Sequence, residues 1–143
     1  MTKAWEQALM ENRHAVLDRW SAEAAAMLPG GCDSPVAEAL AVELGRLVDA
    51  IAGGLAVDEA LVRLTRILAV QEMPPSKALS LFFGLLPLCE GLSADARDCL
   101  RNRVDELVLQ AFDCYMKHRE TICQLKVDEG RRRMHMALRR AEA

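Results

Sequence analysis

The last 51 residues, 93–143, contain no proline and only one glycine, Gly130. Proline interrupts a helix strongly, whereas a single glycine in a helix costs only about 1 kcal/mol. The segment therefore predicts one helix, which would be about 75 Å long at 1.5 Å per residue. That is more than twice the ~30 Å diameter of a small domain, so one part should pack on a body and the rest should project from it.

Residues at steps of three and four form a seam along the first half of this predicted helix: Val104, Val108, Ala111, Tyr115, His118, Ile122 and Leu125. Leu100, Leu107 and Phe112 widen the seam, which favours packing against the chain's own helices. Beyond residue 125 the apolar positions thin to Val127, Met134 and Leu138, so this end needs a partner molecule or a further domain to be stable. We expect contacts with a dimer mate or partner protein at Tyr115, His118, Ile122, Met134 and Leu138.

The rest of the chain reads as shorter helices separated by proline and glycine. The pattern predicts a helix over 2–28, a second that starts at Ser34-Pro35 and ends at Gly53-Gly54, and a third capped by Asp58. Residues 76–86 are apolar on every side, which predicts a buried central helix that Pro87 kinks or ends. Ser93 should cap the last helix. No segment alternates like a strand, so we expect an all-α fold.

Composition places the chain among soluble globular proteins of one domain. Hydrophobic residues make up 52% of its 143 residues and charged residues 27%. The five cysteines are an odd number without CxxC spacing, and the first 20 residues do not resemble a secretory signal. We therefore expect reduced thiols and a cytoplasmic location. The longest apolar stretch, 78–89, is too short to cross a membrane.

Charge is distributed unevenly between the two parts of the chain. Residues 126–143 hold six basic and three acidic side chains, or +3, so the other 125 residues carry −6 of the total of −3. The arginines near the end could touch phosphates, but no aromatic residues are interleaved with them and no nucleic-acid motif is present. We expect a helical tail and no nucleic-acid binding.

Few residues are spaced for chemistry. Cys114 and His118 lie four apart and could supply two metal ligands, but a zinc site needs three or four. Cys32, in a predicted exposed loop, could sense redox state. The glycine pairs end helices and do not form a phosphate-binding loop. We expect no enzymatic activity, no cofactor and no metal, and we keep a metal- or redox-dependent activity of Cys114 and His118 as the alternative.

Three stretches together resemble a known family. They are AVLDRW (15–20), LTRILAVQEMPPSKALSLFFGLLPL (64–88) and VDELVLQAFDCYMKHRETICQL (104–125), the last with the pattern A-F-x-x-Y-x-x-x-R-E-x-I. In this order they resemble the N-terminal domain of the RsbR/RsbRD co-antagonist proteins of bacterial stressosomes.

The resemblance implies a globin-like helical bundle that binds no haem, forms homodimers and acts as a sensory module in stress-response signalling. In that family the last helix leads into a STAS output domain, which residues 1–143 do not include. We therefore expect a globin-like domain over 1–125, a projecting helix end over 126–143, and regulation through a protein partner in trans. A sensory role also allows a small-molecule effector.

Overall fold

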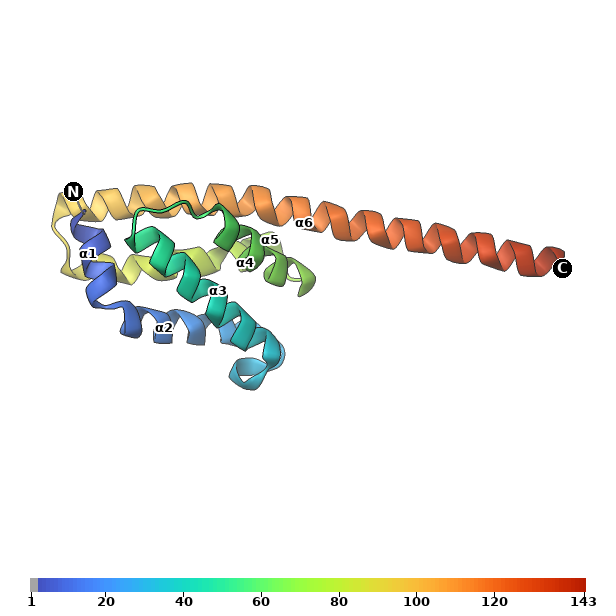
Figure 1. Ribbon diagram of the computed structural model, residues 1–143, viewed down its shortest axis with the longest axis horizontal. Coiled ribbons are helices and arrows are strands. Elements are labelled where there is room, and N and C mark those ends of the chain that lie inside the picture. Colours follow the sequence, from blue (N-terminus) through green and yellow to red (C-terminus); the bar gives the residue numbers. More distant parts are fainter. Residues whose placement is uncertain (1–2) are drawn as a thin grey trace.

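Every regular element in the computed structural model, which describes residues 3–143, is a helix. The α-helices are α1 (Ala4–Glu11), α2 (Arg13–Ala26), α3 (Pro35–Ala52), α4 (Asp58–Val70), α5 (Pro75–Ser80) and α6 (Ala94–Glu142), joined by two 3₁₀ segments, η1 (Gly31–Asp33) and η2 (Leu81–Gly91). The shorter elements gather beside the N-terminal half of α6, and its C-terminal half extends beyond them (Figure 1). The prediction of an all-α fold with a long last helix is confirmed.

Local signals placed several helix ends correctly. The Ser34 hydroxyl accepts a hydrogen bond from the Ala37 backbone N–H at 3.1 Å and starts α3. The Ser93 hydroxyl accepts from the Ala96 N–H at 3.3 Å and starts α6. These bonds satisfy N–H groups that have no partner within the helix. After α3, Gly54 takes a φ of +66°, a conformation that glycine adopts at no steric cost.

The single helix predicted over 2–28 is wrong, because the chain breaks at Asn12 between α1 and α2. The Asn12 side chain donates from Nδ2 to the carbonyl oxygen of Ala8 at 2.8 Å, and its backbone leaves helical geometry at φ −105° and ψ 17°. Asparagine competes in this way with backbone hydrogen bonds. The break lets α1 and α2 each turn an apolar side toward the core, with Trp5 and Trp20 buried.

The helix predicted over 76–86 is also wrong in part. Only Pro75–Ser80 is α-helical, and η2 follows with Pro87 inside it. The Trp20 indole N–H donates to the carbonyl oxygen of Leu81 at 2.6 Å, and Arg19 donates from Nη2 to that of Gly84 at 2.9 Å. Side chains of α2 thus bind carbonyl oxygens along this segment. It is not buried all round either, since Phe83 is 44% exposed.

One hydrophobic core joins all six α-helices and η2. Its largest fully buried side chains include Trp5, Trp20, Phe82 and Tyr115. Burying a large apolar side chain contributes about 1.5–3 kcal/mol, so these residues anchor α1, α2, η2 and α6 to one another. Along α6 the last fully buried residue is Tyr115, and Leu125 is already 59% exposed.

Within residues 3–143, no helix combines the length and apolarity that a membrane-spanning segment requires.

Candidate interaction surface on the last helix

Two side chains of α6 hold the end of α4 and the turn that follows it. The Tyr115 hydroxyl donates to the carbonyl oxygen of Met73 at 2.6 Å, and Arg119 Nη1 donates to that of Ala69 at 2.9 Å. Ala69 is in the last turn of α4, where carbonyls lack a partner within the helix and a cation complements the helix dipole. Tyr115 is fully buried, so this predicted partner contact packs inside its own domain.

His118 and Ile122, two further predicted partner contacts, face the body as well. The Nε2 atom of His118 lies 3.0 Å from the carbonyl oxygen of Val62 on α4. At this distance Nε2 donates a hydrogen bond when it carries the ring proton. Ile122 is half-buried and packs against the core. The seam residues that we predicted to contact a partner therefore pack largely against the chain's own helices.

Asp58 also meets α6. It was predicted as the cap of α4 but is its first residue, and Val57 stands at the cap position. Its Oδ1 atom accepts a hydrogen bond from Gln110 Nε2 at 3.2 Å. Residues from both ends of α4 thus bind α6, which aligns the two helices along their length.

Cys114 and His118 do not assemble a metal centre with other side chains. In the part of the chain that the structure describes, no three His, Cys, Asp or Glu side chains gather so as to hold a metal ion. Burial raises the pKa of the Cys114 thiol, which disfavours the thiolate that zinc binds. The pair offers two ligands at most, and one nitrogen of His118 already faces a backbone carbonyl. Cys32 is exposed in η1.

An ion pair marks the point where α6 leaves the body. Lys126 Nζ lies 3.0 Å from Glu72 Oε1, in the turn after α4. The hydrogen bond and the charge of Lys126 lower the pKa of the Glu72 carboxyl. The two side chains are 61% and 67% exposed, so the pair adds little to stability.

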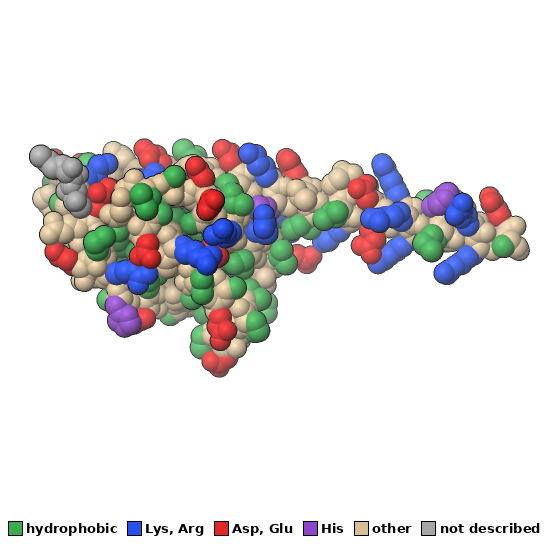
Figure 2. All heavy atoms as spheres, in the orientation of Figure 1, with side chains coloured by type: hydrophobic (Ala, Val, Ile, Leu, Met, Phe, Trp, Pro, Cys, Tyr) green, Lys and Arg blue, Asp and Glu red, His purple; other side chains and the backbone are tan. Residues whose placement is uncertain are grey.

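Beyond this pair α6 projects with all of residues 129–143 exposed. Met134 and Leu138, the remaining predicted partner contacts, are 68% and 58% exposed. Charged side chains of both signs and apolar ones cover the projecting part (Figure 2). This region is therefore the part of the predicted contact set that a partner can reach.

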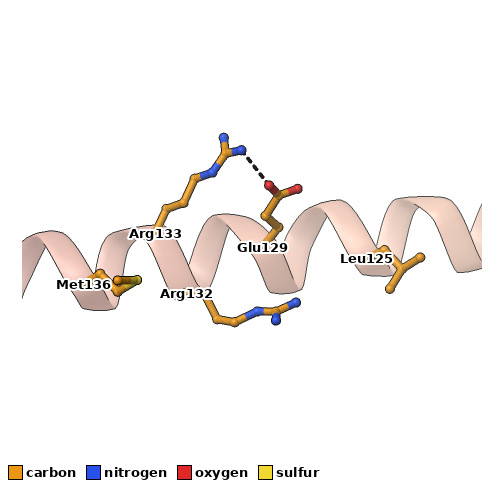
Figure 3. Close-up of a pocket in the computed structure, with 5 residues that line it drawn as sticks. All are labelled: Leu125, Glu129, Arg132, Arg133 and Met136. Carbon is orange, nitrogen blue, oxygen red and sulfur yellow. Dashed lines mark hydrogen bonds and ion pairs between the residues drawn. The ribbon is translucent and has the colours of Figure 1, made fainter.

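The hollow drawn in Figure 3 is lined by α6 alone. Leu125, Arg132 and Met136 line one side of the helix, while Arg133 pairs with Glu129 at 2.6 Å on another. Because no second element walls this hollow, it is an open helix surface suited to another protein and not an enclosed ligand pocket.

A second line of apolar side chains follows the side of α6 away from the seam. Its members recur at helical spacing and are mostly exposed; we call them the outer stripe: Leu109, Phe112, Met116, Cys123, Val127, Met134 and Leu138. Phe112, predicted to pack in the body, is 43% exposed, and Leu109 is 69% exposed. The spacing of Leu109, Phe112 and Met116 could have revealed this line from the sequence. Spacing alone, however, does not say which of two lines faces the body.

A groove of about 410 Å³ lies on the body between α1, α2 and η2. Ala8, Val16 and Leu92 supply apolar walls, and Asn12 and Arg19 supply polar groups. A small molecule that binds the body would find hydrogen-bond donors and apolar contact here.

No protein-family model matches this chain, and neither curated proteins nor solved structures include a significant match to it. Function is therefore inferred from the surfaces of the molecule.

Proposed function

We propose that this chain is a non-enzymatic regulatory domain that works through protein–protein contacts, with α6 as its contact element. One observation carries the proposal: α6 runs past its own body and exposes the outer stripe on both halves. A row of exposed apolar side chains at helical spacing is typical of a helix that packs against another helix, and a helix outside a body is marginally stable in water. A protein partner on α6 would bury this surface and stabilise the projecting half.

The resemblance to RsbR-type N-terminal domains supports the same proposal. All three stretches that carry it meet in the fold, since Arg19 and Trp20 bind the carbonyl oxygens of Gly84 and Leu81. Tyr115 and Arg119, from the pattern on the last helix, bind the carbonyl oxygens of Met73 and Ala69, beside the Q-x-x-P-P-S-K-A turn. A sensory module of that globin-like, dimeric, non-haem kind would use this junction to link its body to its last helix.

The junction suggests how a signal would reach the projecting half. Because α6 binds both ends of α4 and the turn after it, a shift of α4 would carry α6 with it. The groove between α1, α2 and η2 is where we place a small-molecule effector, since η2 also packs against α6. Such an effector would act by favouring one position of η2 and α6 over another.

Sedimentation of the full chain and of a chain truncated after Leu125 tests the proposal. The full chain should self-associate in the micromolar range, and truncation should weaken that association at least about tenfold, a loss of 1.4 kcal/mol. The shortened chain should stay folded, because the one hydrogen bond or ion pair between the removed part and the body, within residues 3–143, is the exposed Lys126–Glu72 pair. Circular dichroism and thermal unfolding provide that control.

A full chain that stays monomeric throughout the micromolar range would argue strongly against the proposal. If the full and the truncated chain associate equally, the projecting half is not part of the contact surface.

A further inference from the structure

The groove between α1, α2 and η2 has a basic side chain at one end and an acidic one at the other. Asn12, Val16 and Arg19 follow one side of α2 at steps of four and three, so the groove extends along this helix for about 10 Å at 1.5 Å per residue. Arg19 ends that line, and Glu11 precedes Asn12 at its start. With a volume of about 410 Å³, the groove has the size of a small-molecule site.

The part of the groove between the two charges is apolar on both walls. Ala15 and Val16 of α2 form one wall. Pro87 and Leu88 of η2, together with Leu92, form the other. None of these side chains has a hydrogen-bonding group. The middle of the groove therefore suits a hydrocarbon body.

Arg19 has free hydrogen-bond donors at its end of the groove. A guanidinium group has five N–H donors, and within residues 3–143 that of Arg19 makes one hydrogen bond, from Nη2 to the carbonyl oxygen of Gly84 at 2.9 Å. Its Nε is buried and lies 3.9 Å from Glu23 Oε1, too far for a hydrogen bond. Glu23 does not line the groove.

The donors that remain have the geometry of a carboxylate site. Nη1 and the second N–H of Nη2 point the same way from the planar guanidinium group, and a carboxylate can accept from both in parallel. The Arg19 side chain is 40% exposed, so a ligand in the groove can reach these donors without breaking the bond to Gly84.

Glu11 disfavours a second negative charge at the opposite end. Its Oε1 atom accepts a hydrogen bond from the neutral Gln7 side chain at 3.1 Å. Within residues 3–143 Glu11 forms no ion pair. Its charge therefore repels an anionic group beside it, whereas a neutral end group lies there without that cost.

We propose that this groove binds an amphipathic monocarboxylate, a molecule with an apolar body and a single carboxylate that Arg19 holds. This inference rests on the proposed function and names the chemical class of its effector. Arg19 and Trp20 bind carbonyl oxygens of η2, and η2 packs against α6. A carboxylate on Arg19 would fix the guanidinium group that holds Gly84, and would thereby favour one position of η2 and α6.

Three probes of equal length separate the effect of charge from that of the hydrocarbon: octanoate, its neutral analogue octanamide, and the dicarboxylate suberate. Their binding to the full chain is followed in proton–nitrogen correlation spectra by the indole N–H signal of Trp20, which donates to the carbonyl oxygen of Leu81 at 2.6 Å. Trp5 does not line the groove, so its indole signal serves as an internal reference. A Trp5→Phe variant assigns the two signals.

We expect octanoate to shift the Trp20 signal with a Kd in the millimolar range, as its small size predicts, and to leave the Trp5 signal in place. Octanamide should bind at least about tenfold more weakly, because hydrogen bonds between charged groups are the stronger ones. Suberate should bind several-fold more weakly than octanoate, because Glu11 repels its second carboxylate.

Substitutions at the two ends of the groove test the two charges separately. Arg19→Gln should weaken octanoate binding about tenfold, and Arg19→Lys, which keeps the charge but not the planar fork, should recover part of that loss. Glu11→Gln should let suberate bind as tightly as octanoate. The matched control is Arg101→Gln, which removes one positive charge at an exposed position of α6 outside the groove and should change the affinity by less than about twofold. Circular dichroism without ligand checks that each variant is folded.

Equal binding of octanoate and octanamide, or an unchanged affinity in a folded Arg19→Gln variant, would overturn the assignment of a carboxylate to Arg19. Suberate that binds the unaltered chain as tightly as octanoate would overturn the preference for a single carboxylate. No shift of the Trp20 signal with any probe, at concentrations well above the millimolar range, would exclude this class of ligand from the groove. Self-association of the full chain in sedimentation would then still support the proposed function.

Discussion

Replacing Tyr115 by phenylalanine tests whether the Tyr115 hydroxyl stabilises the fold or contacts a partner. The ring is fully buried, and its hydroxyl donates to the carbonyl oxygen of Met73 at 2.6 Å. Tyr115→Phe keeps the packing of the ring and leaves that buried carbonyl without its donor, which costs about 1–2 kcal/mol. For a chain of this length the free-energy loss corresponds to a fall in Tm of about 3–8 °C.

Leu109→Ala, on the outer stripe, is the matched variant. Leu109 is 69% exposed, so its truncation should change the unfolding free energy of the monomer by less than about 0.5 kcal/mol while weakening self-association. Thermal and urea unfolding are measured at concentrations too low for association, because binding to the folded state raises apparent stability. Sedimentation at higher concentration measures association. The reasoning is refuted if Tyr115→Phe leaves Tm unchanged but weakens association, since the hydroxyl would then serve a partner.

Two substitutions test other contacts that fix the fold. Gly84→Ala should cost about 1–3 kcal/mol in urea unfolding, because its Cβ would lie 2.7 Å from Cδ1 of the buried Trp20 ring. Gly91 lies in the same segment, and no atom lies within 4 Å of an added Cβ there, so Gly91→Ala should leave the unfolding free energy nearly unchanged. Equal losses in the two variants would contradict the close approach of Gly84 to the Trp20 ring. Arg119→Ala removes the 2.9 Å hydrogen bond to the last turn of α4 and should lower the unfolding free energy by about 1 kcal/mol. Arg140 is exposed and unpaired in the described chain, so Arg140→Ala should change the unfolding free energy by less than about 0.5 kcal/mol in the same assay. A similar loss in the two variants would mean that the Arg119 hydrogen bond does not stabilise the fold.

Helix starts were predictable where the signal is local. Ser34 and Ser93 each bond to a backbone N–H three residues away, so the sequence around the residue contains all the required partners. Asn12 is local too, since its side chain binds Ala8, but asparagine is tolerated inside helices often enough that its presence does not by itself predict a break.

The central segment could not be predicted in the same way. Its change from α to 3₁₀ geometry accompanies bonds to Trp20 and Arg19, which precede the carbonyls they bind by 61 and 65 residues. Apolar composition correctly placed Leu81 and Phe82 in the core. It could not show that Gly84 must admit the Trp20 ring, because that approach depends on how α2 packs.

The last helix shows most clearly which features the sequence determines and which the tertiary structure determines. An uninterrupted run of helix-compatible residues is enough to predict α6 as one helix, because each backbone hydrogen bond of a helix joins residues four apart. Two apolar lines on α6 obey the same spacing. The sequence placed the seam against the chain's own helices but also assigned part of it to a partner, and it did not separate the outer stripe from the seam. Tertiary structure made that choice through distant carbonyls on α4 and its turn, which bind Tyr115, His118 and Arg119. The inner seam is thereby used within the molecule, and the outer stripe remains available to a partner.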